Sequence, residues 1–255
     1  MRPISVLGLG LWTPGFAGVT AWREGRPDPA IDKPACRLID ARLKRGTSLF
    51  ANMLGEVVEQ AATDAGLDVA KVPTVYGSRL GEIETMAVLL RMLFEEDGKL
   101  SPVRFKNSVH NAASGLVSIA TQNTAFTTAI AAGERSFEAS LLEAWALLER
   151  EGGHAIVAVA DDRPPVPLRE LGDHGALAIA IALGTESAPR ARARLSGLRQ
   201  RVALPVSARV PDELAGNCAS AALALVAAVV EGRAGTVPIA LPGRPGGAVD
   251  VHVPA

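Results

Sequence analysis

The sequence has little of what marks several large classes of protein. Only 4% of its 255 residues are aromatic, and Lys+Arg 26 against Asp+Glu 27 leaves a net charge of -1. Without a basic excess, we expect no nucleic-acid partner and no attraction to a membrane surface. Glycines interrupt the apolar start MRPISVLGLG too early for a signal sequence or a membrane span. We therefore expect a globular, cytoplasmic protein.

Cysteines and metal-binding patterns are scarce as well. Cys36 and Cys218 lie far apart and match no CxxC or Cys/His zinc spacing, which predicts two reduced thiols. Asp161 and Asp162 are adjacent carboxylates that could hold Mg²⁺, but such a pair at a strand end is more often a solvated turn. In GLGLWTPG, Thr13 replaces the third glycine of a dinucleotide fingerprint. The sequence thus predicts no metal site and no cofactor.

The apolar periodicity predicts an α/β chain. Continuous apolar runs that read as strands occupy residues 4–9, 72–76, 154–160 and 176–183, and helical spacing occupies residues 48–65, 82–94 and 110–122. The segment SPVRFKN at 101–107 reads as extended. We expect a mixed five-stranded sheet with helices on both faces.

Beyond residue 184 the composition changes. A basic segment, 190–204, predicts an edge strand, 217–231 an alanine-rich helix, and the Gly/Pro-rich segment 235–247 a loosely ordered surface loop before a terminal strand. We expect an α/β domain over residues 1–200 and a reduced C-terminal lobe over residues 201–255.

A strand-turn-helix unit is the most informative segment. TTAIAAGERSFEASLLEA, residues 127–144, runs from a small-residue strand through Gly133 and Glu134 into an amphipathic helix. Many α/β enzymes display a nucleophile at such a turn, where a helix begins. Here the displayed residue is Glu134, and an ionised carboxylate is a weak nucleophile toward a thioester.

The succession of segments resembles the N-terminal half of a β-ketoacyl synthase. The resemblance covers roughly residues 3–200 and rests on the order of ISVLGLGLWTPG, AATDAGLDVA, PTVYGSRLGEI, SVHNAASGLVSIA, the unit at 127–144, AIVAVADD and GALAIAIALG. It is closest to the short chain-length-factor-like homologues of aryl polyene and related type II polyketide systems. The resemblance implies a thiolase-like fold with a complete N-terminal half and a reduced C-terminal half, and a dimer.

The departures from that family concern its catalytic residues. The resemblance places Glu134 where an active synthase carries its cysteine, and Asn217, in GNCASAAL, where it carries the second of two histidines. The stretch that would hold the first histidine is missing. The resemblance therefore implies no catalytic residue and a non-catalytic partner of a full-length β-ketoacyl synthase. The expected assembly is a heterodimer that an acyl carrier protein could visit, with a homodimer possible in isolation.

The same resemblance implies which residues lie at the pocket or the interface. The expected interface strand is 126–132, made of small and apolar residues. The pocket or interface residues are Phe105, His110, Asn111, Phe126, Ala129, Ala131, Gly133 and Phe137.

Three other interpretations stay open. Glu134 could simply be an acidic residue that favours a helix N-terminus. The chain could be an acyltransferase or hydrolase that uses His110 as base with Ser114, Ser136 or Cys218 as nucleophile, although no orienting third group is evident. It could also be a stand-alone binding protein for an acyl or aromatic ligand.

Overall fold

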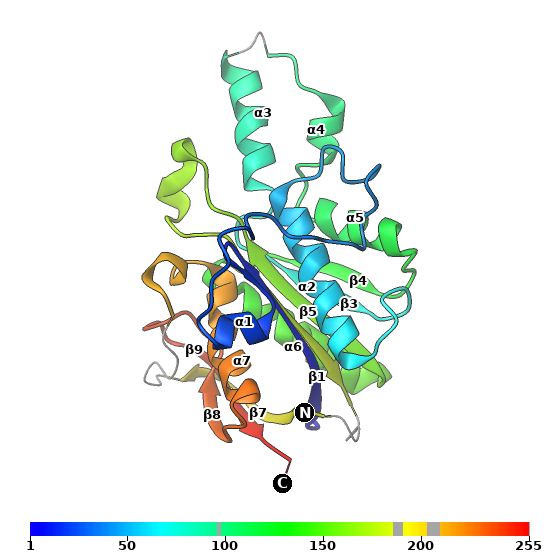
Figure 1. Ribbon diagram of the computed structural model, residues 1–255, viewed down its shortest axis with the longest axis vertical. Coiled ribbons are helices and arrows are strands. Elements are labelled where there is room, and N and C mark those ends of the chain that lie inside the picture. Colours follow the sequence, from blue (N-terminus) through cyan, green and yellow to red (C-terminus); the bar gives the residue numbers. More distant parts are fainter. Residues whose placement is uncertain (96–97, 186–190, 203–209, 255) are drawn as a thin grey trace.

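One mixed β-sheet runs through the whole chain in the computed structural model, which describes residues 1–95, 98–185, 191–202 and 210–254 (Figure 1). The order is β4 (Thr127–Ile130), β3 (Thr74–Gly77), β5 (His154–Asp161), β6 (Leu177–Gly184), β1 (Ile4–Thr13), β7 (Ala193–Val202), β9 (Gly246–His252) and β8 (Gly235–Pro238), with β2 (Phe16–Ala17) on β1. β3 is parallel to β4 and β5, whereas β6 is antiparallel to β5 and β1.

The sheet is longer than the five strands expected from the sequence. β4, β3, β5, β6 and β1 are those five, and β7, β9 and β8 continue the same sheet, which has nine strands with β2. β7 is not an edge strand, because it pairs with both β1 and β9. The expected loop at 235–247 contains β8, whose Pro238 is tolerated because β8 is the edge and needs no second partner.

Side chains alternate cleanly between the two faces of the sheet. In β6, Leu177, Ile179, Ile181 and Leu183 face one core cluster, and the intervening alanines at 178, 180 and 182 face the other. This alternation follows from the period of two along a strand. The branched side chains fill one layer, while the alanines let helices pack close on the opposite face.

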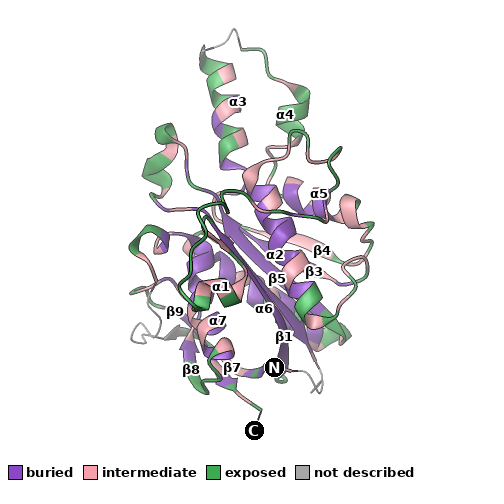
Figure 2. Ribbon diagram, in the orientation of Figure 1, coloured by how far each residue is buried: buried purple, intermediate pink, exposed green. Residues whose placement is uncertain are grey.

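Helices cover both faces, as the sequence predicts. α6 (Ser136–Glu151), α7 (Leu223–Val230) and the 3-10 segment η4 (Cys218–Ala222) pack on the leucine-rich face. α2 (Leu49–Ala65) and α5 (Ala112–Thr121) pack on the alanine-rich face. Figure 2 shows the sheet strands as the most continuous buried region.

Two glycines of the GLGLWTPG motif have a packing role. A Cβ at Gly8 would lie 2.4 Å from the Ala61 carbonyl oxygen, and one at Gly10 would lie 2.3 Å from the Val57 carbonyl oxygen. Any side chain at either position would therefore push α2 off the sheet. The motif serves the contact of β1 with α2.

α3 (Ile83–Glu95) and α4 (Pro102–Lys106) project beyond the sheet at the top of Figure 1. The prediction of an extended 101–107 is wrong, because Ser101 accepts a hydrogen bond from the Arg104 N–H and Pro102 occupies the first helical turn. Proline is favoured there, because a backbone N–H in the first turn has no acceptor within the helix and proline loses nothing by lacking one. The smaller elements are α1 (Val19–Arg23), η1 (Gly133–Arg135), η2 (Val166–Leu171) and η3 (Asp212–Leu214).

The C-terminal strands turn a polar face outward. Asp250 on β9 is paired with Arg199 of β7 and accepts a hydrogen bond from Thr236 of β8, and Ser196 lies 2.7 Å from a ring nitrogen of His252. A polar face needs no covering layer of helices. β7 continues across the expected boundary at residue 200. The division into residues 1–200 and 201–255 stays a prediction.

No helix in the described part of the chain is both long enough and apolar enough to cross a membrane.

Candidate functional site

The turn between β4 and α6 has the conformation that the sequence predicts. Gly133 adopts a φ of 61°, in the left-handed region that favours glycine, and begins the 3-10 turn η1. The Ser136 hydroxyl accepts a hydrogen bond from the Ala132 N–H at 3.1 Å and lies 2.7 Å from the Gly133 carbonyl oxygen. Ser136 therefore stabilises the turn from within, and its hydroxyl is already engaged.

Glu134 is the residue that this turn displays. It is partly exposed, and it forms an ion pair with Arg244, whose Nε lies 3.9 Å from a carboxylate oxygen. Both side chains are solvated, so this ion pair contributes little to stability. A carboxylate in this position cannot form the thioester that a cysteine would form. The turn thus displays a carboxylate and no thiol.

Asn217 is a buried structural residue at the N-cap of η4. Its amide nitrogen donates to the carbonyl oxygens of Asp161 and Gly175, both at 2.9 Å, and its amide oxygen accepts from the Ala219 N–H at 3.0 Å. Both amide protons are therefore committed to backbone carbonyls. An amide also cannot exchange a proton as an imidazole does, so Asn217 does not offer general acid or base catalysis.

Asp161 contradicts the expectation of a solvated turn, because it is fully buried. Its Oδ1 accepts hydrogen bonds from the Ser78 hydroxyl at 2.6 Å and from the backbone N–H groups of Arg79 and Leu80 at 3.0 and 2.9 Å. The carboxylate thereby joins the end of β5 to the loop after β3. Sequence reasoning missed this role, although an acid directly following an apolar strand was the available signal.

Cys218 lies beside Asp161 in the same buried cluster. Burial, followed by the nearby carboxylate of Asp161, raises the pKa of the Cys218 thiol well above its usual range. Since the thiolate is the reactive form, this cysteine is not an activated nucleophile. Both cysteines are free thiols, as the sequence predicts, and the structure shows that both are buried. Over residues 1–95, 98–185, 191–202 and 210–254, no group of three or more His, Cys, Asp or Glu side chains is arranged to hold a metal ion.

Asp162 makes the stability of the protein depend on pH. Burial raises the pKa of its carboxyl from 3.8 to about 6, with smaller contributions from Glu84 and Asp161. The folded state therefore binds this proton more tightly than the unfolded chain does, so stability decreases as the pH rises from about 4 to about 6. A shift of this size corresponds to at most about 3 kcal/mol.

We expect the urea midpoint to be lower at pH 7 than at pH 5, and Asp162→Asn to reduce that difference. Parallel urea titrations of the wild type and the variant measure the effect. An identical pH dependence in both proteins would contradict the assignment to Asp162.

His110 lines a groove of about 480 Å³ at the base of α3 and α4. Its Nε2 lies 3.4 Å from the Ser78 carbonyl oxygen. The candidate nucleophiles are engaged elsewhere, since Ser114 donates to the Asn111 carbonyl oxygen. Within the described residues, His110 forms no hydrogen bond with Ser114, Ser136 or Cys218. The groove is otherwise lined by Leu80, Gly81, Glu82, Ile83, Met86, Phe105, Ser108 and Val109.

Exposed apolar side chains lie at both ends of β4 and on the helix α5 that contacts it. β4 is the first strand in the sheet order, so its outer edge has no neighbouring strand in the described part of the chain. Phe126 is 44% exposed and Ala131 is exposed, and α5 contributes Ile119, which is 69% exposed. Exposed strand edges with apolar surroundings are sites of pairing with another chain.

The remaining residues expected at the pocket or interface differ in exposure. Phe105 and Asn111 are exposed and lie in the segment that leads into α5. Ala129 packs partly against the alanine-rich core, whereas Phe137 is 1% exposed and belongs to the leucine-rich core. Phe137 therefore packs in the core next to the turn and does not reach the surface.

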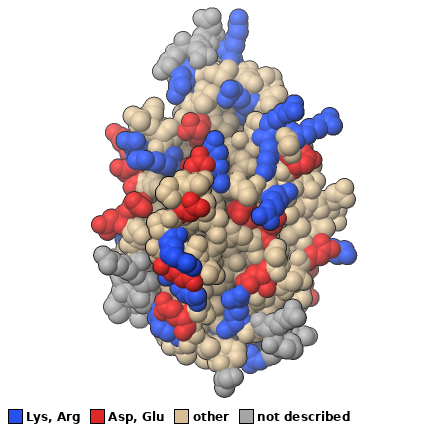
Figure 3. Space-filling view, viewed as in Figure 1, with Lys and Arg blue, Asp and Glu red and all other residues tan. Residues whose placement is uncertain are grey.

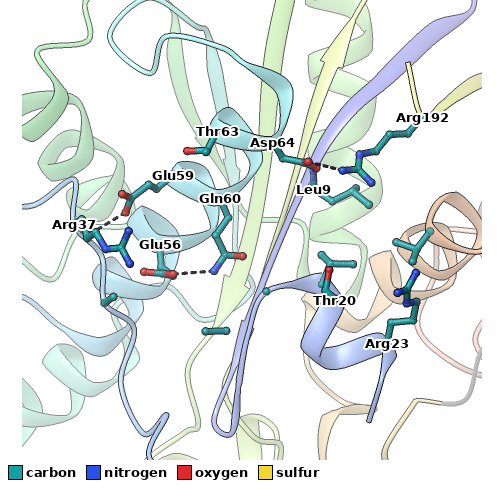
Figure 4. A pocket seen from close by; sticks show the side chains of 15 residues that line it. Leu9, Thr20, Arg23, Arg37, Glu56, Glu59, Gln60, Thr63, Asp64 and Arg192 are labelled. Carbon is teal, nitrogen blue, oxygen red and sulfur yellow. Dashed lines mark hydrogen bonds and ion pairs between the residues drawn. The ribbon is translucent and has the colours of Figure 1, made fainter. Parts of the chain in front are cut away.

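A second cavity of about 610 Å³ lies beside β1 and α2 (Figure 4). Two of its carboxylates form hydrogen bonds with the backbone. Asp64 accepts a hydrogen bond from the Leu9 N–H at 2.9 Å, and Glu59 accepts one from the Arg37 N–H at 3.0 Å. Arg192 forms an ion pair with Asp64. Acidic and basic residues are intermixed on this face of the molecule (Figure 3). The cavity therefore shows no charge of one sign that would select a ligand.

Comparison with known proteins identifies one family and one group of structures. The sequence model described as "Beta-ketoacyl synthase, N-terminal domain" matches residues 20–237. A search of curated proteins found no match.

Several solved structures share the fold at low sequence identity. A chain from the ketosynthase ApeO in complex with its chain length factor ApeC, from Xenorhabdus doucetiae, has a TM-score of 0.71 and 17% identity, with coverage of 99% of this chain and 100% of that one. A chain from the complex of a type II PKS acyl-carrier protein with its ketosynthase (AntDE:AntF) has a TM-score of 0.65 and 17% identity, with coverage of 80% of this chain and 70% of that one. The ishigamide ketosynthase/chain length factor has a TM-score of 0.59 and 18% identity, with coverage of 79% of this chain and 68% of that one.

Proposed function

Because the chain belongs to the β-ketoacyl synthase N-terminal domain family, we propose that it acts as a non-catalytic, chain-length-factor-like partner of an active ketosynthase. The thiolase-like α/β fold expected from the sequence is confirmed by the solved structures. The observation that carries the proposal is the turn after β4, where Glu134 stands at the displayed position and no cysteine is present. A chain with this turn keeps the architecture of a synthase without its nucleophile.

The free edge of β4 supports the partnership. Antiparallel pairing of β4 with the corresponding strand of a ketosynthase would cover the exposed apolar side chains around Phe126 and Ile119. A stable interface of this kind buries more than about 1,000 Å². Two similar solved structures are of a ketosynthase with its chain length factor, and a third is of an acyl-carrier protein in complex with its ketosynthase. We propose a heterodimer that receives substrate from such a carrier protein, in an aryl polyene or related polyketide pathway. In the absence of its partner, the chain is proposed to form a homodimer through the same surface.

An acylation assay tests the proposed loss of catalysis. The purified chain is incubated with a reactive acyl thioester and its intact mass is measured, with an active ketosynthase as the positive control. We expect no covalent adduct, because Glu134 cannot hold a thioester and Cys218 is buried with a raised pKa. An adduct formed by the folded chain and mapped to Ser114, Ser136 or Cys218 would instead support the interpretation as an acyltransferase or hydrolase.

The groove beside His110 favours a second candidate function. Its walls include Met86, Phe105 and Val109, an apolar lining that suits an acyl chain or an aromatic ring. A stand-alone binding protein would bind such a ligand as a monomer, without a ketosynthase. Sedimentation analysis in the presence of a ketosynthase separates the two functions. A chain that stays monomeric there, and that binds free fatty acid, supports the stand-alone binding function.

A further inference from the structure

Glu138 connects the turn after β4 to the C-terminal strands. It lies in the first turn of α6, is only 5% exposed, and accepts hydrogen bonds from Nε and Nη2 of Arg135 at 2.9 and 2.5 Å. The same carboxylate accepts a third hydrogen bond from the Gly247 N–H, at the start of β9, at 3.1 Å. One buried side chain thus joins two segments that are more than a hundred residues apart.

The local sequence on both sides suits this contact. A Cβ at Gly247 would lie 2.9 Å from the Glu138 carboxyl carbon, so glycine allows the backbone of β9 to approach the carboxylate. A buried carboxylate is costly unless its hydrogen bonds are satisfied, and here Arg135 and Gly247 satisfy them. Arg135 belongs to the same 3-10 turn that displays Glu134.

The other side of the turn is attached to β3. The Ser136 hydroxyl lies 3.1 Å from the Ser78 carbonyl oxygen, directly after β3. Residues 131–138 are therefore held between the end of β3 and the start of β9. The end of the free β4 edge is thus positioned by two contacts, and one of them comes from the start of β9.

We propose that the C-terminal strands act as a brace for the partner-binding edge, with Glu138 as the positioning residue. The brace fixes the conformation of residues 131–136 and with it the end of the β4 edge that a second chain would meet. This inference rests on the proposed function as a ketosynthase partner. It assigns a role to C-terminal strands that carry no catalytic residue of their own.

Hydrogen exchange of the isolated chain tests the brace without any partner. Glu138→Gln removes the charge that pairs with Arg135 and keeps an acceptor for Gly247, whereas Gly247→Ala presses on the carboxylate from the side of β9. The matched control is Asp250→Asn, which removes an ion pair on the outer face of the same strand. We expect amide exchange in residues 131–138 to become about tenfold faster in the first two variants and to stay unchanged in the control.

Two outcomes would overturn the brace. One is unchanged exchange over residues 131–138 in both variants. The other is an equal acceleration over the whole chain, which would mean that Glu138 supports only global stability. If the Glu138→Gln variant does not fold, hydrogen exchange over residues 131–138 in Gly247→Ala tests the brace by itself.

The link to the partner is measured separately, by co-purification with a co-expressed full-length ketosynthase. Glu138→Gln is expected to weaken association about tenfold while the variant stays folded. Unchanged association together with accelerated exchange would overturn the partner role of the brace and leave the proposed function standing. If the wild-type chain associates with no ketosynthase, the proposed function fails, and the exchange experiment still decides whether Glu138 positions the turn.

Discussion

Replacing Asp161 with alanine is expected to lower the free energy of unfolding by about 3–5 kcal/mol. The carboxylate is fully buried and accepts three hydrogen bonds at one oxygen, from the Ser78 hydroxyl and from the N–H groups of Arg79 and Leu80. Alanine would leave both of these N–H groups, which belong to half-buried residues, without this acceptor, and would detach the loop after β3 from the end of β5. Urea unfolding of both proteins, followed by circular dichroism, measures the difference.

The control for this effect is a carboxylate in an exposed network. Asp250 pairs with Arg199 and Thr236 on the outer face of the C-terminal strands. Because solvent screens that ion pair, Asp250→Asn should cost less than about 1 kcal/mol. If Asp161→Ala were as mild as Asp250→Asn, the hydrogen bonds at Asp161 would not be an essential connection of the fold.

Replacing Ala131 with arginine is expected to abolish association with a ketosynthase while the chain itself stays folded. Ala131 is exposed in the isolated chain, directly after β4, so the guanidinium would remain in water there. In the proposed dimer the same charge would be buried without a partner, at a cost of several kcal/mol, which corresponds to a loss of affinity of at least about a hundredfold. Co-purification and the melting temperature are the two measurements.

Ala234→Arg serves as the matched variant at the opposite edge of the sheet, because Ala234 is also exposed and directly precedes β8. It should bind the ketosynthase like the wild type. Undiminished association of the Ala131→Arg chain would place the interface elsewhere and remove the main support for a heterodimer through β4.

The strand, turn and helix around Glu134 could be predicted because their signals are local. Small and apolar residues precede Gly133, and helical periodicity follows Ser136, so β4, η1 and α6 form where the sequence predicts them. The absence of a cysteine at the turn was equally visible. By contrast, the Gly/Pro content of 235–247 indicated a loop, yet the first four residues of this segment form β8, because pairing with β9 outweighs the local preference.

The sequence by itself determined the α/β class, the order of most elements and the absence of a cysteine at the turn after β4, since each depends on residues close together in the chain. Only the tertiary structure decided the roles of its buried polar groups. Asp161 bonds Ser78 across 83 positions, and Glu138 bonds Gly247 across 109. Whether a carboxylate is solvated or buried depends on which distant segments the fold brings to it, and no local pattern encodes that pairing. The same holds for β7, which became a central strand when β9 paired with its second edge.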